Sequence, residues 1–331
     1  MNKLNFGVIG CGGIAKNTLV PQTAAISDFK LHAFADISEA KAEELRAKYG
    51  AAYATTDASR IISDPNVDAI MICTLPDTHA SLAIQALEAG KHVFIQKPVS
   101  INMAESIALA RAAKNAKGIA MAAYCYRWSP IVARIREVIP QPNLIFAHMM
   151  NSDLMNSHRH YLGIPGLDHG GPMLELACHN VDMACCLANS VPVRVSAHGG
   201  NLRHPGANII DNFAMTIEFA NGAVATLLSG DCGDGDFSKK WFTEVFGDNT
   251  SAVNHGFREL VITGRVNETT THDYGAGIGL NRDMEVFRDV LNGAPNPAPV
   301  RQSVISSVLM LKAFESMREY KVVNVNAEEI P

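Results

Sequence analysis

Short apolar runs and longer amphipathic stretches alternate along the first 120 residues. Strands that alternate with helices at this spacing predict βαβ units and a parallel sheet. The apolar runs lack strict alternation, which is typical of strands covered on both faces. We therefore expect an α/β, doubly wound domain over residues 1–122. The expected strands are 4–9, 31–35, 69–73, 92–95 and 119–123, and the expected helices are 38–49, 78–89 and 103–117.

The pattern changes after residue 123. Residues 212–219 alternate strictly between apolar and polar positions, and Asn221-Gly222 then predicts a type I′ hairpin turn into residues 223–228. Such alternation predicts an α+β domain over residues 123–331 with an antiparallel, half-exposed sheet. An apolar outer face on that sheet would favour self-association, so we expect a homodimer or homotetramer. Further strands are expected at 144–150, 191–198, 241–246 and 260–263.

Composition narrows the class of protein. The 331 residues are 47% hydrophobic and 18% charged, which predicts a packed globular chain with room for two domains. The formal net charge of −5 disfavours a nucleic-acid partner, which would need a basic face. No apolar stretch approaches the roughly 20 residues that span a bilayer. Seven scattered cysteines without a CxxC pair favour reduced, buried thiols in a cytoplasmic protein. We expect no signal peptide, because residues 1–3 lead straight into the first expected strand.

A glycine-rich loop follows the first expected strand. Residues 10–15 read Gly-Cys-Gly-Gly-Ile-Ala and lead directly into a helix, which matches a dinucleotide-binding fingerprint. Gly10 permits a tight turn, Gly12 lets the backbone approach a pyrophosphate, and Ala15 allows close packing of helix on strand. The alternative is a glycine turn without a ligand. The expected pyrophosphate contacts are Gly10, Gly12, Gly13 and Ile14.

The second expected strand ends at Asp36. A carboxylate at this position accepts hydrogen bonds from the adenosine ribose and repels a 2′-phosphate, and no Arg follows at once to offset the repulsion. The sequence therefore favours NAD over NADP. The alternative is an Asp that caps the following helix.

Two further strand ends carry candidate chemistry. Residues 74–79 and 96–98 lie at the carboxyl ends of parallel strands, where such sheets bind ligands. Lys97 could hydrogen-bond a substrate hydroxyl and stabilise a developing alkoxide, although a lone Lys at a strand end can also be a solvated charge. The cofactor contacts expected here are Thr74, Leu75, Pro76, His79, Gln96 and Lys97.

A polar stripe marks an otherwise apolar helix that begins near Gly170-Gly171-Pro172. Glu175 and His179 are four residues apart, and Asp182 follows three residues later, so all three share one face. A His held by neighbouring carboxylates is a natural general base. The alternative is a buried polar cluster that only satisfies itself.

A metal site is the other interpretation of this region. Its candidate ligands match no zinc signature in their spacing, so we expect no metal. They are His158, His160, His169, Glu175, Cys178 and His179.

Together these segments resemble the glucose-fructose oxidoreductase and inositol dehydrogenase (Gfo/Idh/MocA) family over nearly the whole chain. Residues 10–15 resemble its glycine loop, and 74–79 its Thr-Pro-Asn-x-x-His segment with an offset of one residue. Gln-Lys-Pro at 96–98 stands where the family has Glu-Lys-Pro. Residues 126–130 resemble its Arg-aromatic-x-Pro segment, and 170–182 its Gly-Gly…Asp-x-Gly-x-His-x-x-Asp helix.

The resemblance implies a Rossmann domain followed by an α/β domain on a large, open, mostly antiparallel sheet that often forms a dimer or tetramer contact. It implies metal-free hydride transfer between NAD(P) and a secondary alcohol of a sugar, cyclitol or glycoside. Lys97 would then contact the substrate hydroxyl and the nicotinamide ribose, and His179 would take the hydroxyl proton. Glu175 would stand where an Asp often binds substrate and orients the His. Arg127 would join the cofactor contacts. Arg159 would join the substrate contacts, where it could meet a carboxylate or several hydroxyls, and the alternative is an exposed loop Arg.

Three departures from the family pattern concern the site. Gln96 removes a negative neighbour from Lys97, so we hypothesise a lower pKa for Lys97 than in relatives. Glu175 is one methylene longer than Asp, which suits a pocket shaped for a different substrate. Ala177 replaces the usual Gly.

Two other functions remain open at this point. One is an enzyme that keeps NAD tightly bound and recycles it within each turnover. The other is a non-catalytic NAD sensor, which the presence of both Lys97 and His179 disfavours.

Overall fold

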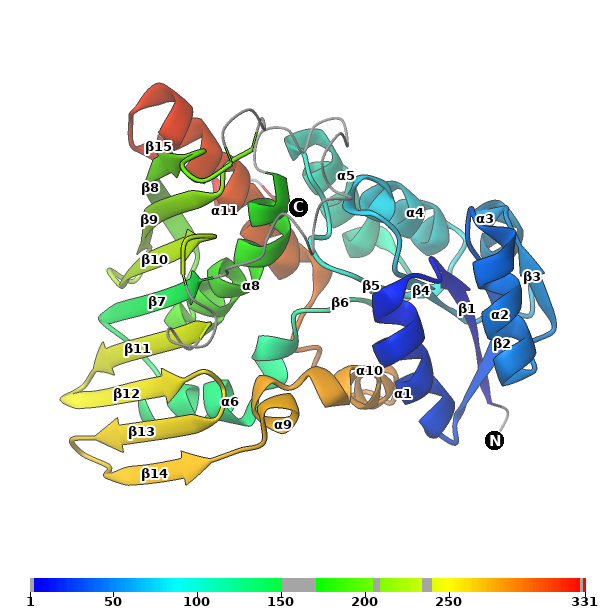
Figure 1. Ribbon diagram of the computed structural model, residues 1–331, viewed down its shortest axis with the longest axis horizontal. Coiled ribbons are helices and arrows are strands. Elements are labelled where there is room, and N and C mark those ends of the chain that lie inside the picture. The colour runs from blue at the N-terminus through cyan, green and yellow to red at the C-terminus, as the bar shows by residue number, and fades with distance from the viewer. Residues whose placement is uncertain (1–2, 151–170, 205–208, 234–239, 328–329) are drawn as a thin grey trace.

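The computed structural model describes residues 3–150, 171–204, 209–233, 240–327 and 330–331 (Figure 1). Its strands form two separate sheets, one of six strands and one of nine. This arrangement confirms an α/β architecture in which a doubly wound parallel sheet precedes a mostly antiparallel one.

The first sheet is parallel throughout and has the strand order β3-β2-β1-β4-β5-β6. The order reverses at β1, so β1 and β4 lie side by side with their carboxyl ends at the same edge, where doubly wound sheets bind ligands. The strands are β1 (Leu4–Ile9), β2 (Phe29–Ala35), β3 (Tyr53–Thr55), β4 (Ala69–Ile72), β5 (His92–Ile95) and β6 (Ala120–Ala122).

Helices cover both faces of this sheet. α4 and α5 lie together on one face, and α1 lies on the other beside α10 (Figure 1). α4 starts with Pro76 in its first turn, and Asn102 caps α5 by accepting a bond from the Glu105 N–H at 2.9 Å. The helices are η1 (Ala15–Leu19), α1 (Val20–Ala25), α2 (Glu39–Tyr49), α3 (Ala58–Ile62), α4 (Pro76–Glu88) and α5 (Met103–Asn115).

One helix from the second half of the chain completes the first domain. α10 (Asp283–Leu291) places Phe287 against Phe6 of β1 and Phe94 of β5, with ring centroids 6.2 and 5.4 Å apart. The core of the parallel sheet therefore depends on residues far beyond 122 in the sequence.

The second sheet has the order β14-β13-β12-β11-β7-β10-β9-β8-β15 and is antiparallel except between β7 and β10. Its strands are β7 (Leu144–Met150), β8 (Pro192–Gly200), β9 (Asn212–Phe219), β10 (Val224–Gly230), β11 (Trp241–Gly247), β12 (Thr250–His255), β13 (Glu259–Thr263), β14 (Glu268–Thr271) and β15 (Val323–Asn324).

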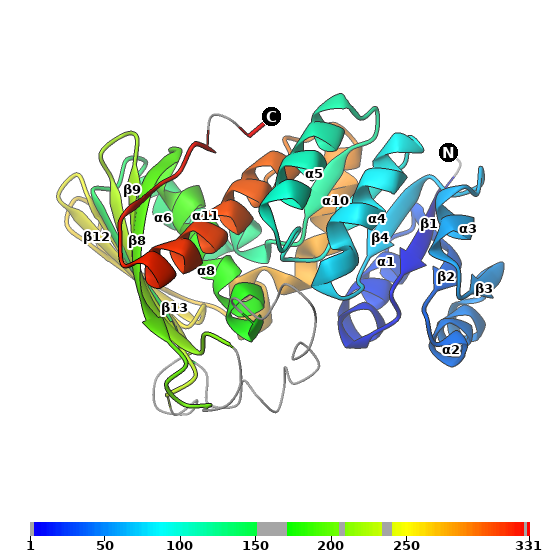
Figure 2. The ribbon, with the colours of Figure 1, turned by 90° about the horizontal axis from the view of Figure 1, so that it is seen from above.

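In the described part of the chain, helices cover only one face of the second sheet and leave the other face bare (Figure 2). α8 packs on β7 and β10, while α11 packs on β8. The remaining helices of this half are η2 (Cys125–Trp128), α6 (Pro130–Val138), α8 (Gly171–Ala188), α9 (Tyr274–Ile278), η5 (Leu280–Arg282) and α11 (Val300–Glu319). Among the described residues, no helix is long and apolar enough to span a membrane.

The hairpin predicted at Asn221-Gly222 joins β9 to β10, but its turn type was wrong. Gly222 has a positive φ of 88°, whereas Asn221 is absent from the residues with positive φ, so the turn is not type I′. Two successive positive φ angles occur instead at Asp248 and Asn249, 51° and 54°, between β11 and β12.

Candidate active site

The glycine loop after β1 has the shape of a phosphate cradle. Gly10 has φ +92°, and a Cβ there would lie 2.5 Å from the carbonyl of Cys73, so only glycine fits. A Cβ on Gly12 would meet nothing within 4 Å, which leaves space in front of the loop. The Lys16 N–H donates to the Gly12 carbonyl at 2.9 Å and starts the helix. These residues fit the pyrophosphate of a dinucleotide at a helix N-terminus.

Asp36 at the end of β2 ties two backbone segments together. Its Oδ2 accepts from the Cys11 N–H and its Oδ1 from the Ser38 N–H, each at 2.8 Å. The carboxylate thus supports the glycine loop and also bonds to the start of α2, as the capping alternative required. Each carboxylate oxygen has a second acceptor position, so both bonds are compatible with contacts to a ribose hydroxyl.

Three exposed apolar side chains surround this edge of the sheet. Ile37, beside Asp36, is 97% exposed, Leu75 is 41% exposed, and Ile14 is 37% exposed. The flat rings of a bound dinucleotide would cover these three side chains if they lay across the carboxyl ends of the strands. Ile37 was not singled out from the sequence, and its position directly after Asp36 is the signal that could have found it.

His79 anchors the two strand ends to each other. Its Nδ1 lies 2.8 Å from the Pro98 carbonyl oxygen, and its Nε2 lies 3.1 Å from the Thr74 carbonyl oxygen. The side chain is buried, and burial lowers its pKa below the usual 6.5. His79 therefore holds the segments after β4 and β5 in place, and its described contacts are all with the protein.

Lys97 and Glu175 meet across the boundary between the two domains. Lys97 Nζ forms an ion pair with Glu175 Oε1 and donates to the Glu175 carbonyl oxygen at 3.1 Å. The two side chains are only 13% and 10% exposed. Burial lowers the pKa of Lys97 below its usual 10.5. Glu175 of α8 thus supplies the negative neighbour that Gln96 cannot provide. Burial, and not the lack of a carboxylate, is therefore the main cause of the lowered pKa of Lys97.

His179, one turn after Glu175, is held by aromatic rings. Its imidazole stacks on Tyr126 with centroids 4.8 Å apart and meets the edge of Tyr124 at 5.8 Å. Nδ1 is buried and has no hydrogen-bond partner among the described residues. No described carboxylate therefore holds this nitrogen, and the orientation of His179 by carboxylates stays a prediction. Tyr124 and Tyr126 fix the ring plane, a role that the sequence did not reveal.

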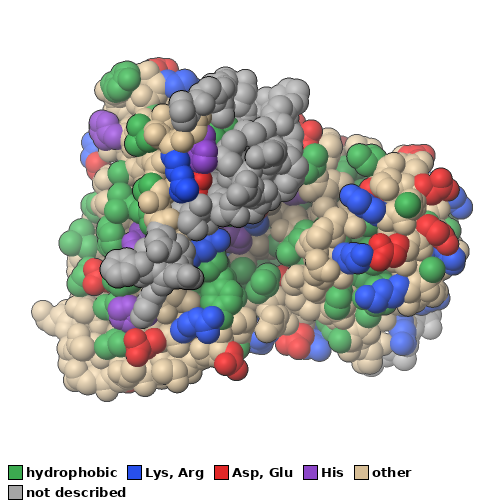
Figure 3. Space-filling model, viewed as in Figure 1, with side chains coloured by type: hydrophobic (Ala, Val, Ile, Leu, Met, Phe, Trp, Pro, Cys, Tyr) green, Lys and Arg blue, Asp and Glu red, His purple; other side chains and the backbone are tan. Residues whose placement is uncertain are grey.

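Burial and two nearby positive charges favour the neutral form of His179. Burial lowers the pKa of its imidazole well below 6.5, and the charges of Lys97 and Lys240 lower it further. A neutral imidazole can accept a proton from a substrate hydroxyl. The surface has a hollow between the two domains (Figure 3). Basic side chains, of Lys or Arg, and His side chains face this hollow.

Asp182 and Arg127 form a buried ion pair behind His179. Arg127 Nε and Nη2 donate to the two carboxylate oxygens at 2.7 and 2.9 Å, and Ser306 Oγ donates to Asp182 at 2.8 Å. Arg127 Nη1 donates to Gln302 Oε1 at 2.6 Å and to the Pro297 carbonyl at 3.2 Å. All three guanidinium nitrogens of Arg127 thus have protein partners. Asp182 is thus bonded to Arg127 and Ser306, as expected for the alternative in which a buried polar cluster only satisfies its own hydrogen bonds.

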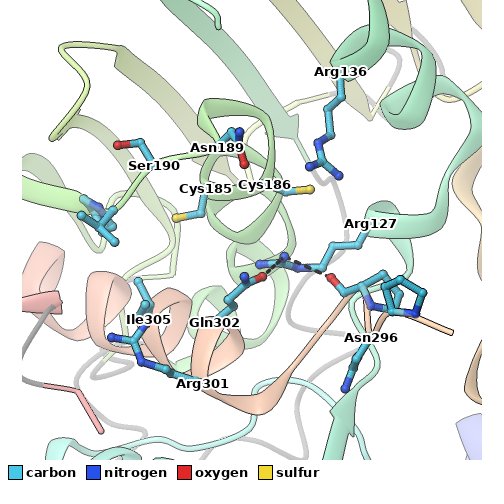
Figure 4. Close-up of a pocket in the computed structure, with 14 residues that line it drawn as sticks. Arg127, Arg136, Cys185, Cys186, Asn189, Ser190, Asn296, Arg301, Gln302 and Ile305 are labelled. Atoms are coloured by element: carbon cyan, nitrogen blue, oxygen red, sulfur yellow. Dashed lines mark hydrogen bonds between the residues drawn. The ribbon is translucent and has the colours of Figure 1, made fainter. Parts of the chain in front are cut away.

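A cavity of about 510 Å³ lies on the far side of this ion pair, where Arg127 and Gln302 line it together with Arg136 and Arg301 (Figure 4). Lys97, Glu175 and His179 are not among its lining residues. The cavity is therefore separate from the site built around His179.

Two groups of predicted residues remain to be placed. Arg159, His158, His160 and His169 lie outside the described residues. Within the described part of the chain, no group of three or more His, Cys, Asp or Glu side chains could hold a metal ion.

Comparisons with known proteins identify the family. Residues 4–124 match the model described as "Oxidoreductase family, NAD-binding Rossmann fold", and residues 142–253 match the "GFO/IDH/MocA C-terminal domain". The levoglucosan dehydrogenase of Pseudarthrobacter phenanthrenivorans is 30% identical over 262 residues, 69% of this chain and 67% of the relative. The chain belongs to the Gfo/Idh/MocA family of oxidoreductases. It is therefore an oxidoreductase with an NAD-binding Rossmann domain.

Further relatives agree with this assignment. The myo-inositol 2-dehydrogenase of Thermotoga maritima is 27% identical over 274 residues, 81% of this chain and 77% of the relative. A solved structure described as levoglucosan dehydrogenase in complex with NADH and levoglucosan superposes with a TM-score of 0.82 at 23% identity. That comparison covers 98% of this chain and 100% of the other, and it shows that the fold is shared.

Proposed function

We propose that this Gfo/Idh/MocA protein catalyses reversible hydride transfer between NAD and a secondary alcohol of a polyhydroxylated substrate, with Lys97 and His179 as catalytic residues. The observation that carries the proposal is the meeting of Lys97, Glu175 and His179 from two domains at the carboxyl edge of the parallel sheet. Bound NAD⁺ would supply the hydride acceptor. The relatives named inositol and levoglucosan dehydrogenases support a sugar, cyclitol or glycoside as substrate.

The chain's own residues divide the remaining work of the oxidation. As the hydride leaves the carbinol carbon, its hydroxyl proton passes to a ring nitrogen of neutral His179, and the carbon–oxygen bond becomes a carbonyl. The Lys97 ammonium hydrogen-bonds that oxygen and stabilises its developing negative charge. Glu175 holds Lys97 in position and keeps it charged despite burial. Reduction of the ketone uses the same groups in reverse.

The cofactor is proposed to be NAD rather than NADP because of Asp36. Its carboxylate at the end of β2 would repel a 2′-phosphate, and its oxygens already orient the glycine loop. The exposed side chains of Ile14 and Ile37 would lie under the adenosine half.

Three further properties belong to the same proposal. Arg159 contributes to substrate binding, because its segment precedes the catalytic helix. The seven cysteines are free thiols, which supports a cytoplasmic location. The bare face of the second sheet supports a homodimer or homotetramer.

The test is NADH absorbance while purified protein and NAD⁺ meet a panel of cyclitols, aldoses, sugar acids and glycosides. We expect a rise with at least one class, lost in Lys97→Ala and in His179→Asn while NADH still binds. Turnover that survives both substitutions would refute the assignment of this catalytic pair. A flat response from protein that is purified with NADH already bound would favour internal recycling of the cofactor instead.

A further inference from the structure

The start of β11 lies beside the catalytic turn of α8. Trp241 and Thr243 are two residues apart and share one face of the strand. Thr243 Oγ1 contacts Met183 Sδ at 3.9 Å, and Met183 lies one helical turn after His179. β11 therefore contacts α8 one turn beyond His179.

A line of aromatic rings connects this point to His179. Trp241 lies against Phe257 with ring centroids 6.5 Å apart, Phe257 against Tyr126 at 4.5 Å, and Tyr126 stacks on His179 at 4.8 Å. At the other end, Lys240 Nζ lies 4.6 Å from the centroid of the Trp241 ring. The Lys240 ammonium thus lies at one end of this series of rings, and His179 lies at the other end.

The charges of the site do not balance. Lys97 is neutralised by Glu175, but Lys240 has no acidic partner among the described residues. Arg258, 5.3 Å from the ring of Tyr274 that stacks on Trp241, also has no acidic partner in the described part of the chain. The Trp241 indole N–H is buried and, within the same ranges, has no acceptor. Among the described residues, the partly buried ammonium of Lys240 and the buried indole N–H of Trp241 therefore both lack an anionic partner.

We propose that Lys240 and Trp241 form a subsite for a carboxylate, and that the substrate is a polyhydroxylated acid such as a uronate or aldonate. This inference rests on the proposed function. A carboxylate suits one ammonium and one N–H donor, whereas a phosphate ester is usually held by several cationic groups. Burial lowers the pKa of Lys240, and the charge of Lys240 lowers the pKa of both Lys97 and His179, which places the ammonium within electrostatic reach of the reacting groups.

Ligand binding tests the subsite without requiring turnover. The full chain saturated with NADH is titrated calorimetrically with the pairs D-glucose and D-glucuronate, D-galactose and D-galacturonate, and D-glucitol and D-gluconate. D-Glucose 6-phosphate is the phosphate arm. We expect at least one acid to bind about 10-fold or more tightly than its neutral partner, equivalent to about 1.4 kcal/mol.

Substitutions at Lys240 then assign the preference. Lys240→Met and Lys240→Gln should remove it, Lys240→Arg should retain most of it, and the exposed Lys114→Met on α5 should leave it unchanged. Equal or tighter binding of the neutral partner in every pair, or tightest binding of the phosphate, would overturn the proposal. A preference that survives both neutral variants would also overturn it.

Turnover separates this inference from the proposed function. If neutral polyols are oxidised in a Lys97-dependent reaction while acids are neither bound nor oxidised, the carboxylate subsite fails and the function stands. If acids bind through Lys240 but nothing is oxidised, the subsite stands and the proposed function fails.

Discussion

At the scale of single residues, the ion pair between Lys97 and Glu175 links the first domain to α8 of the second. Gln96, next to Lys97 in the sequence, cannot supply a charge, and α8 brings the carboxylate from a position 78 residues away. The carboxylate partner of the proposed catalytic lysine is therefore on a different element from the one that the family pattern suggests.

Replacing this carboxylate should impair catalysis. We expect Glu175→Gln to lower kcat/KM about 10- to 100-fold, because the buried ammonium of Lys97 loses the charge that keeps it protonated. Steady-state kinetics measures the effect. Adding Gln96→Glu to this variant should recover part of the loss, and equal activity of wild type and Glu175→Gln would contradict the assigned role.

His179 should set the acid limb of the pH profile. In the proposed mechanism its neutral form is the base, so oxidation should proceed above its pKa and be lost as the pH falls through that pKa, which lies well below 6.5. We expect kcat/KM for oxidation to remain high at pH 6.5 and to fall only in more acidic buffer. Lys240→Met removes a positive neighbour, so it should move this limb to higher pH. An unchanged limb in the variant would show that the Lys240 charge does not reach His179.

At the scale of secondary-structure elements, the Arg127–Asp182 pair attaches α8 to η2 and, through Ser306, to α11. Removing one partner leaves an uncompensated buried charge. We therefore expect Arg127→Met to lower the free energy of unfolding by about 3–5 kcal/mol. Urea denaturation monitored by circular dichroism measures the loss. Arg136→Met, at an exposed position on α6, is the matched control and should change stability little.

The elements themselves could largely be predicted from the sequence. Apolar runs without alternation predicted the parallel strands, and strict alternation predicted β9, because burial on two faces or on one dictates each pattern. The turn after β9 could not be typed, because Asn221 is compatible with either sign of φ and the tertiary structure selects one. β12 and β14 were not predicted: β12 mixes polar with small residues, and β14 consists of Glu and Thr.

The site was only partly predictable. Lys97, Glu175 and His179 belong to recognisable local motifs, whereas Lys240 and Trp241 have no local signal. They enter the site only because β11 pairs with β7 and packs against α8. Arg127 was expected to contact the cofactor, and the structure shows its guanidinium bonded to Asp182 and Gln302.

At the scale of the whole molecule, the bare face of the nine-stranded sheet is the expected contact between subunits. Its centre carries Phe146 and His148 of β7 beside Phe242 of β11, and Leu144 and Phe246 nearby are 54% and 36% exposed. An apolar surface of this kind is typically covered in an oligomer.

A single charge should weaken this contact. We expect wild type to sediment as a dimer or tetramer at micromolar concentration and Phe242→Glu to dissociate at least 10-fold more readily, about 1.4 kcal/mol. Analytical ultracentrifugation measures both. Val322→Glu, at an exposed position outside this face, is the control. A monomeric wild type would exclude the interface.

The packing of α10 on the first sheet also has a consequence for biosynthesis. The last strand of that sheet ends at Ala122 and α10 begins at Asp283, so roughly 160 residues must be translated between them. At about 5–20 residues per second this takes on the order of 8–32 s. During that interval Phe6 and Phe94 lack the ring of Phe287. We therefore expect the nascent N-terminal domain to expose apolar surface at Phe6 and Phe94 during this interval, and an isolated fragment that ends near residue 122 to be prone to aggregation.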